Sequence, residues 1–198
     1  MLAQSQLLSV AMVGLVPIQV DDANRLLADW GHRLGPINRP FTMQAFALEV
    51  DGRPVSVAVS ASTVSNTVAG LKRTEVVECA RLCSAVPWAN RIMLRLWREV
   101  CAPRWPDWVP VAAVSYSQNA HHSGDLYRFD GWHKMSATAG TRSGGGAWTR
   151  KRYATDAVLG PKTLWLWPYR TVSTWRAKAP ALRFVETSQG IFMPKYVT

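Results

Sequence analysis

Residues 111–132 place the strongest limit on the fold, because they run from an uncharged apolar segment through a polar segment to a glycine. Residues 111–114 are all apolar, which predicts a strand covered on both faces of a sheet. The polar residues that follow lie at its carboxyl end, where open sheets hold their ligands. Ser123 is the predicted N-cap of a short helix that carries Tyr127, and Gly131 is its predicted stop. The chain is therefore expected to contain a sheet with helices on its faces.

The front half of the chain is predicted to be antiparallel. Residues 41–50 and 54–62 are apolar and rich in β-branched side chains, and Asp51-Gly52 between them is a strong two-residue turn signal. These features predict a β-hairpin. A strand over 12–20 is expected ahead of it, followed by an amphipathic helix over 21–31 that its first residue caps.

The middle of the chain carries charge inside a predicted strand. Residues 74–83 are strand-like but include Glu78 and Arg81. Such charges indicate either a salt bridge at a sheet end or a site that lines a cleft, and both interpretations stay open. Pro87 then precedes a strong amphipathic helix over 88–100.

The later segments complete the prediction of the fold. Residues 64–73 and 135–146 are expected to be loops, and 164–167 are expected to be the last strand. The order of elements predicts an α+β (α/β) fold with a mixed central sheet of about six to seven strands flanked by helices. One domain is expected over 1–170, with a basic C-terminal extension over 171–198.

The charge of the chain favours a polyanionic partner. The formal net charge is +10, and the sequence pI is about 10.1. A genome rich in G and C would also favour arginine without any such partner. Basic residues interleaved with tryptophans after residue 141 are typical of nucleic-acid binding, although these tryptophans could instead pack under the tail. The predicted nucleic-acid contacts are Arg142, Trp148, Arg150, Lys151 and Arg152.

Cysteine usage and hydropathy suggest the cell compartment. The chain has 3 cysteines and no CxxC pair, so a reduced, cytoplasmic setting is expected and no structural zinc site is visible. The apolar N-terminal run has no Lys or Arg ahead of it and is too short to span a bilayer. No membrane partner is therefore expected, and the oligomeric state stays open.

The order of elements resembles the GNAT acyltransferase fold, in which two central strands splay apart and the acyl donor enters the gap. The segment 126–132 looks like the Y-x-x-x-G-[FW] motif of that superfamily, whose tyrosine commonly protonates the departing thiolate. A narrower set of motifs resembles the Mom family of phage DNA-modification proteins: Arg81-Leu82-Cys83, Ala89-Asn90, Ser115-Tyr116-Ser117 and Tyr127 with Gly131-Trp132. In that family an adenine in DNA receives a carbamoylmethyl-type group that protects phage DNA from restriction.

The resemblance implies a set of site residues. The catalytic candidates are His32, Arg81, Tyr127 and Ser117, and the cofactor-binding candidates are Leu82, Cys83, Ala89, Asn90 and Ser115. The chain departs from its relatives at two places. Ser117 stands where relatives often have an acid, and residues 85–90 replace a Gly-rich loop that wraps the pyrophosphate of coenzyme A. Because Pro87 lacks an amide donor and Trp88 is bulky, acetyl-CoA, an aminoacylated RNA and another small molecule all remain possible donors.

Group transfer to an amine requires a base, a charge stabiliser and an acid. We expect His32 to act as the base, Arg81 as a permanently charged anion clamp, and Tyr127 as the acid. A histidine that only faces the dipole of a helix end is the alternative for His32.

A metal site is a minority hypothesis. His121, His122 and Asp125 are possible ligands, and the Mom resemblance implies iron. Two histidines that face solvent in a loop are the simpler interpretation.

Three functions stay open at this point. The first is a phage-type transferase that attaches a small acyl- or carbamoylmethyl-like group to a DNA base, with DNA as its partner. The second is an acetyl-CoA-dependent N-acetyltransferase that acts on a small-molecule or protein amine. The third is a non-catalytic DNA-binding protein on a decayed transferase fold.

Overall fold

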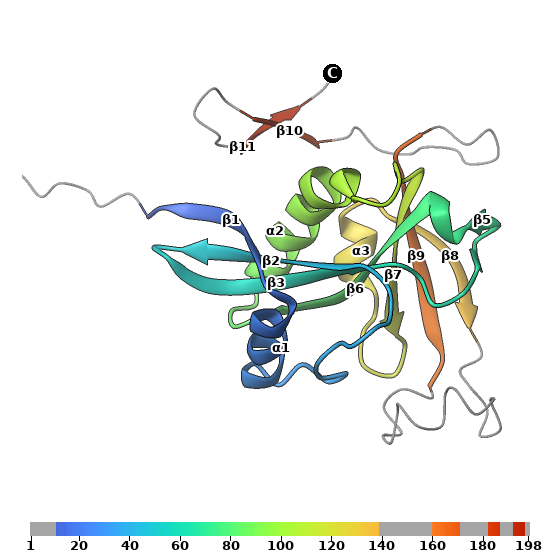
Figure 1. The fold of residues 1–198 in the computed structure, drawn as a ribbon, viewed down its shortest axis with the longest axis horizontal. Coiled ribbons are helices and arrows are strands. Elements are labelled where there is room, and N and C mark those ends of the chain that lie inside the picture. The colour runs from blue at the N-terminus through green and yellow to red at the C-terminus, as the bar shows by residue number, and fades with distance from the viewer. Residues whose placement is uncertain (1–10, 139–159, 171–181, 187–191, 197–198) are drawn as a thin grey trace, which may run out of the picture.

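The computed structural model describes residues 11–138, 160–170, 182–186 and 192–196. A seven-stranded sheet forms the centre of the molecule, in the order β1-β2-β3-β6-β7-β9-β8 (Figure 1). Its strands are β1 (Val13–Ile18), β2 (Met43–Val50), β3 (Arg53–Ala61), β6 (Val76–Ser84), β7 (Ala112–Gln118), β8 (His133–Thr138) and β9 (Lys162–Pro168).

Helices and short strands surround this sheet. The helices are α1 (Val20–Asp29), α2 (Ala89–Leu96) and α3 (Asp125–Phe129), with a π turn η2 (Trp97–Cys101) and the 3-10 turns η1 (Arg73–Glu75) and η3 (Ala102–Arg104). Two further antiparallel pairs are β4 (Thr67–Val68) with β5 (Leu71–Lys72), and β10 (Leu182–Glu186) with β11 (Phe192–Tyr196).

The sheet is buried on both faces by different elements. On one face α2, η2 and α3 cover a core that includes Val77, Ala113 and the fully buried Trp97. On the other face, Ala23 and Leu27 of α1 cover the half of the sheet formed by β2 and β3. We call these the α2 face and the α1 face. Because Ala23 and Leu27 are four residues apart, they lie on one side of α1, as an amphipathic helix requires.

The parallel pair β6 and β7 opens within the sheet. Their ladder joins Val76–Cys79 to residues 112–115 and stops there. Beyond that point β6 continues its pairing with β3 as far as Ser84, and β7 continues its pairing with β9 as far as Gln118. The two strands therefore part after Cys79 and Ser115, and Figure 1 shows them diverging. We call this point the fork.

The predicted hairpin is confirmed as β2 and β3. Asp51 and Gly52 both have positive φ, at 50° and 73°, which is the conformation of the hairpin turn that Asp-Gly favours. The α+β class and the mixed sheet are also confirmed. The division into 1–170 and 171–198 stays a prediction.

Several local predictions are wrong. Residues 135–138 belong to the edge strand β8, although their small and polar side chains favoured a loop. Residues 64–73 contain the β4–β5 hairpin. Helix α1 begins at Val20 with Gln19 as its N-cap, so the predicted cap at its second residue lies inside the first turn. The predicted helix over 88–100 is α-helical only to Leu96, where η2 begins.

The short helix α3 begins one residue later than the sequence indicates. Gly124 is its N-cap, and the hydroxyl of Ser123 accepts a hydrogen bond from the amide of Asp125 at 3.3 Å. None of the helices in the described ranges is long and apolar enough to cross a membrane.

Candidate functional site

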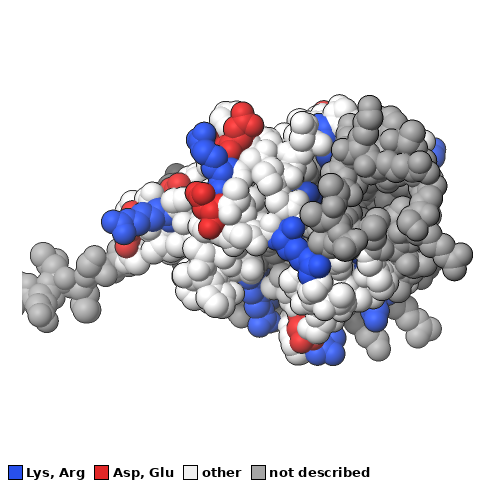
Figure 2. Space-filling view, turned by 90° about the horizontal axis from the view of Figure 1, so that it is seen from below, with Lys and Arg blue, Asp and Glu red and all other residues white. Residues whose placement is uncertain are grey.

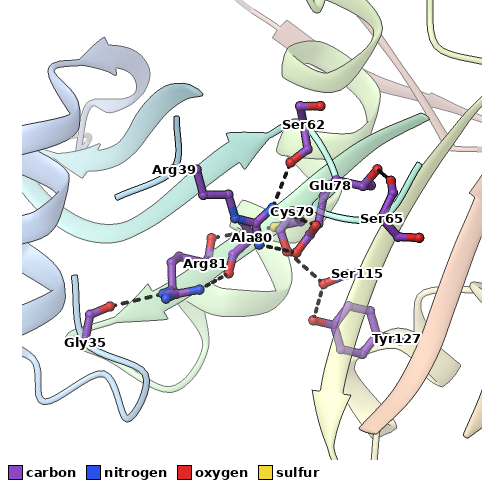
Figure 3. A network of polar contacts seen from close by, with 11 residues as sticks. Gly35, Arg39, Ser62, Ser65, Glu78, Cys79, Ala80, Arg81, Ser115 and Tyr127 are labelled. Carbon is purple, nitrogen blue, oxygen red and sulfur yellow. Dashed lines mark hydrogen bonds and ion pairs between the residues drawn. The ribbon is translucent and has the colours of Figure 1, made fainter. Parts of the chain in front are cut away.

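The fork is held on the α2 face by three residues. The hydroxyl oxygens of Ser115 and Tyr127 are 2.8 Å apart, and Ser115 donates to the backbone carbonyl of Cys79 at 3.1 Å. Because the only hydroxyl hydrogen of Ser115 is directed to Cys79, the Tyr127 hydroxyl is the donor to Ser115. Figure 3 shows this chain of contacts running from β6 through β7 to α3. The structure thus places Tyr127 and Ser115, both predicted site residues, where the strands part.

The Tyr127 side chain is enclosed by aromatic rings. It stacks on Trp165 with ring centroids 5.4 Å apart and meets the edge of Trp132 at 5.5 Å. Burial raises the pKa of Tyr127 well above its ordinary value, and the hydrogen bond with Ser115 only partly opposes this. The hydroxyl therefore keeps its proton at neutral pH and can act as a hydrogen-bond donor.

A β-bulge in β6 sets which side chains face the opposite side of the sheet. Cys79 lies opposite Ser60 and Arg81 lies opposite Val59, so Ala80 is an extra residue on β6. Side chains alternate along a regular strand, and residues three apart would normally face opposite ways. The bulge therefore places Arg81 on the α1 face, the same face as Glu78.

Glu78 is paired with an arginine from the loop after α1. The two guanidinium nitrogens of Arg39 contact the two carboxylate oxygens of Glu78, each at 2.8 Å, and Arg39 also donates to the carbonyl of Ser62 at 2.8 Å. Both side chains are largely buried. This bidentate pair lies beside the fork (Figure 3).

Arg81 joins the same loop to β6. Its Nε donates to the carbonyl of Gly35 at 3.1 Å, and one terminal nitrogen donates to the carbonyl of Ala80 at 2.8 Å. The residue is only 8% exposed. The predicted anion clamp therefore also holds the loop after α1 against the strand.

His32 lies in that loop, and its amide donates to the carbonyl of Leu27 at 2.8 Å. Its pKa is lowered to about 4, first by burial, then by the positive charge of Arg81 and then by His122. Within the described residues, its buried Nδ1 has no hydrogen-bond partner. The structure thus brings His32 and Arg81 into one electrostatic environment, in which the imidazole is neutral at neutral pH.

Two further side chains belong to this environment. Burial raises the pKa of Tyr116 to about 12, and the charge of Glu78 adds to that effect. Burial lowers the pKa of Lys162. The negative charge of Glu78 opposes this shift, and the positive charges of Arg81 and Arg39 add to it. We call the group His32, Arg39, Glu78, Arg81, Tyr116 and Lys162 the α1-side cluster. Sequence reasoning identified its members on β6 and His32 but missed Arg39 and Lys162.

Ser117 lies on the α2 face and is engaged by an aromatic side chain. Its hydroxyl oxygen accepts a hydrogen bond from the indole nitrogen of Trp165 at 2.8 Å, and the residue is 4% exposed. The predicted catalytic role of Ser117 stays a prediction, and its observed contact is to the ring that stacks on Tyr127.

The predicted cofactor-binding residues on β6 do not share one face. Leu82 packs on the α2 face, whereas Cys83 belongs to the core under α1. Burial raises the pKa of the Cys83 thiol. Leu82 therefore lies on the same face of the sheet as Ser115, and the Cys83 side chain lies on the opposite face.

The loop before α2 offers a poor cradle for phosphate. Pro87 has no amide hydrogen, the amide of Ala89 donates to the carbonyl of Val86 at 3.2 Å, and Trp88 is 52% exposed. Asn90, also a predicted cofactor contact, has a buried Oδ1 without a hydrogen-bond partner among the described residues.

The metal hypothesis gains no support. Asp125 pairs with Arg128 at 2.7 Å, and both His121 and His122 are exposed. Across the described ranges, no group of three His, Cys, Asp or Glu side chains could hold a metal ion.

The predicted nucleic-acid contacts Arg142, Trp148, Arg150, Lys151 and Arg152 lie outside the described residues. In the view of Figure 2, Lys and Arg side chains are spread over the described surface, several of them beside an acidic residue. DNA binding therefore stays a prediction.

Solved acetyltransferases share the fold. A structure of AAC(6')-Ib in complex with ribostamycin and coenzyme A matches with a TM-score of 0.53 and 12% identity, covering 85% of this chain and 99% of that chain. A probable acetyltransferase from Staphylococcus epidermidis ATCC 12228 matches with a TM-score of 0.51 and 9% identity, covering 80% and 100%. An N-acetyltransferase from Staphylococcus aureus Mu50 gives 0.50 and 6%, covering 79% and 97%.

These identities show the fold alone, and they confirm the predicted GNAT-like architecture. No protein-family model and no curated protein sequence matched this chain. The narrower resemblance to the Mom family finds no support among these comparisons.

Proposed function

We propose that this chain is an N-acyltransferase that transfers an acyl-type group from a thioester, with acetyl-CoA as the first donor to test, to an amine at the fork. The observation that carries the proposal is the parting of β6 and β7 directly after Cys79 and Ser115, with the Tyr127 hydroxyl held at that point. Structural neighbours that were solved with coenzyme A support the choice of donor.

The reaction requires one bond to form and one to break. The amine nitrogen bonds to the carbonyl carbon, the carbon–sulfur bond breaks, and its electron pair leaves on sulfur. The Tyr127 hydroxyl is protonated, and its single hydrogen, which it donates to Ser115 in the structure, would turn from Ser115 to the departing thiolate. Its raised pKa disfavours complete transfer of that proton to a thiolate, whose ordinary pKa is about 8.5. Tyr127 would therefore stabilise the leaving group chiefly by hydrogen bonding.

The α1-side cluster limits the kind of amine. His32, with a pKa of about 4, is a weak base, and both carboxylate oxygens of Glu78 accept from Arg39. Among the described side chains near the fork, neither is suited to take a proton from an ammonium ion at neutral pH. The cations at 81 and 162 also disfavour an ammonium substrate. The proposal therefore favours amines that are already neutral at pH 7, such as aromatic amines.

The test is a thioester assay with matched amines. Purified protein is incubated with acetyl-CoA and either an aromatic or an aliphatic amine, and free thiol and acylated product are measured. We expect transfer to the aromatic amine, and Tyr127→Phe should lower kcat by about a hundredfold, as for loss of an oxyanion-hole-type donor. Tyr169→Phe is the control, because Tyr169 donates to the carbonyl of Arg98 and its amide pairs at Val111, before β7 reaches the fork.

A DNA base is the second candidate acceptor. Two observations favour it: the net charge of +10, and the basic side chains Arg81 and Lys162 of the α1-side cluster, in which the charge of Arg39 is already paired with Glu78. An exocyclic base amine is also neutral at pH 7. The test is to express the chain in a bacterium, digest total DNA to nucleosides and search by mass for a modified base, comparing wild type with Tyr127→Phe and Arg81→Ala. Unmodified DNA, together with transfer to a small aromatic amine, would exclude a DNA base as the acceptor and would leave a small aromatic amine.

A further inference from the structure

We infer that Ser117 and Asp130 are positioning residues for Tyr127, because each fixes the indole ring of a tryptophan that packs against the Tyr127 ring. This inference rests on the proposed role of Tyr127 at the fork. We call Ser117, Trp165, Trp132 and Asp130 the tyrosine clamp.

Trp165 forms the first half of the clamp. Its ring is nearly parallel to that of Tyr127, with an interplanar angle of 14°, and its indole nitrogen donates to Ser117 at 2.8 Å. The backbone of Gly124 also lies directly against this ring. A Cβ at Gly124 would lie 2.3 Å from Cζ2 of Trp165, so only glycine permits this approach. The position of the ring is therefore fixed by a hydrogen bond and by direct contact.

Trp132 forms the second half. Its ring meets Tyr127 at 80°, and its indole nitrogen donates to Oδ2 of Asp130 at 3.1 Å. The Asp130 carboxylate is fully buried and also pairs with Arg95 at 2.8 Å and Arg98 at 2.7 Å. These two arginines come from α2 and η2, so they tie the turn after α3 to the long helical segment beneath it.

The backbone links the same turn to Tyr127. The carbonyl of Tyr127 accepts hydrogen bonds from the amides of Asp130 at 3.2 Å and Trp132 at 3.0 Å. One ring parallel to Tyr127 and one nearly perpendicular to it oppose rotation of its side chain. The hydroxyl is therefore directed at Ser115, and that direction depends on the two polar residues that hold the indoles.

A role limited to satisfying buried indole groups makes a different prediction. In that case, Ser117 and Asp130 would affect stability and leave the chemistry at the fork unaltered. Ser60 provides the matched control, because its hydroxyl accepts from the indole nitrogen of Trp97 at 2.8 Å and both residues are buried. Ser60→Ala thus removes the same kind of hydrogen bond from Trp97, whose ring stacks on Trp132 with centroids 6.4 Å apart but, among the ring pairs described, does not contact Tyr127.

The kinetic experiment uses the full chain and acetyl thioesters whose leaving thiols differ in pKa. If the Tyr127 hydroxyl stabilises the thiolate, Tyr127→Phe should lose about a hundredfold with an alkyl thioester and far less with an aryl thioester, whose thiolate needs little help. Ser117→Ala should lose about tenfold with the alkyl thioester and little with the aryl one, and Ser117→Thr should restore the rate. Ser60→Ala should not change this dependence. Equal losses with all thioesters, or no losses, would overturn the inference.

Asp130→Asn leaves two buried guanidinium groups beside a neutral amide and can fail to fold. Trp132→Phe is the second variant for this half of the clamp, because it removes the indole donor and leaves the ion pairs of Asp130 intact. It should show the same selective loss with the alkyl thioester.

A second measurement does not depend on turnover. With tyrosines labelled at the ring carbon that carries oxygen, NMR reports the ionisation of Tyr127, which is assigned with Tyr127→Phe. In the wild type this signal should not titrate near the ordinary tyrosine value of about 10. In Ser117→Ala and Trp132→Phe it should titrate closer to that value, because the hydroxyl gains access to water. An unchanged signal in both variants would overturn the clamp even if no thioester reacts, whereas inactivity of the wild type with a changed signal would contradict only the proposed function.

Discussion

The two faces of the sheet at the fork differ in chemistry. On the α2 face the groups around the Tyr127 hydroxyl are uncharged: Trp165 and Trp132 enclose the ring, and the hydroxyl is directed at Ser115. The buried charges of this face, Asp130 with Arg95 and Arg98, contact Trp132 instead of Tyr127. The α1 face is charged, with Glu78 paired to Arg39 and further cations nearby. Under the proposed function, the α2 face would set the geometry of Tyr127 and the α1 face would set the electrostatic potential that an acceptor meets.

The faces also depend on different interactions for stability. Rings on the α2 face gain from burial and stacking, which tolerate small changes of volume. The charges on the α1 face gain only while every partner is present, because a buried charge without its partner is costly. Substitutions on the two faces should therefore lower the free energy of unfolding by different amounts.

Among substitutions of single residues that flank the fork, the largest effect is expected from breaking the buried ion pair on the α1 face. Glu78→Ala leaves the guanidinium of Arg39 without its carboxylate, which should lower the free energy of unfolding by about 3–5 kcal/mol. Urea denaturation measures the change. Arg25→Ala removes an exposed ion pair with Asp22 and should cost less than about 1 kcal/mol. Similar losses from both substitutions would mean that the α1 face is open to water.

The pH dependence of stability tests the same face through His32. The pKa of this group is lowered from 6.5 to about 4 on folding, so the unfolded chain takes up a proton that the folded chain refuses. The wild type should therefore lose stability relative to His32→Gln as the pH falls from 6.5 to about 4. The two pKa values correspond to at most about 3 kcal/mol at the acid end.

Urea denaturation of both proteins near pH 7 and near pH 4 measures this difference. A constant gap between wild type and His32→Gln would show that the imidazole is hydrated and remote from Arg81, against the close environment that the α1-side cluster requires.

A smaller effect is expected on the α2 face from Gly124→Ala. The new methyl group would collide with Trp165, and Gly124 also has a φ of +81°. Gly70→Ala is a matched control, because Gly70 has the same φ and a methyl group added there would meet no atom within 4 Å. Both substitutions share the cost of positive φ, so their difference isolates the contact. We expect Gly124→Ala to be less stable by about 2 kcal/mol, measured by thermal unfolding.

The two faces were not equally predictable from the sequence. The α2 face follows from local patterns: an apolar strand, a tyrosine and a glycine at fixed spacing, and an amphipathic helix after Pro87. These patterns located Tyr127 and Ser115 beside the end of β7. The hydrogen bond between Trp165 and Ser117 could not be predicted from local patterns, because the two residues are 48 positions apart in the sequence.

The α1 face depends on contacts that leave no local pattern. Arg39 comes from an irregular loop and pairs with a residue 39 positions later. The bulge at Ala80, which turns Arg81 toward that pair, has no glycine or proline to mark it. The charge inside a predicted strand indicated that Glu78 needed a partner. Only the pairing of β3 with β6 shows on which face of the sheet the Glu78 side chain and its partner lie.

The smallest effect is expected for binding to DNA, and it decides whether the charge of the α1 face serves a polyanion. If Arg150, Lys151 and Arg152 each contact a phosphate, the triple alanine variant should lower affinity by about tenfold and reduce the slope of log K against log salt by about 2.7. Lys162→Met, at the α1 side of the fork, should reduce the slope by about 0.9 if that face also meets the backbone. Titration of a labelled duplex over a range of salt concentrations measures both slopes. If only the triple variant changes the slope, the α1-side cluster does not contact the DNA backbone and would serve a small acceptor. If only Lys162→Met changes the slope, residues 150–152 are not part of the interface. Unchanged slopes in both variants would show that neither residues 150–152 nor Lys162 contact phosphate, and would contradict the predicted DNA interface.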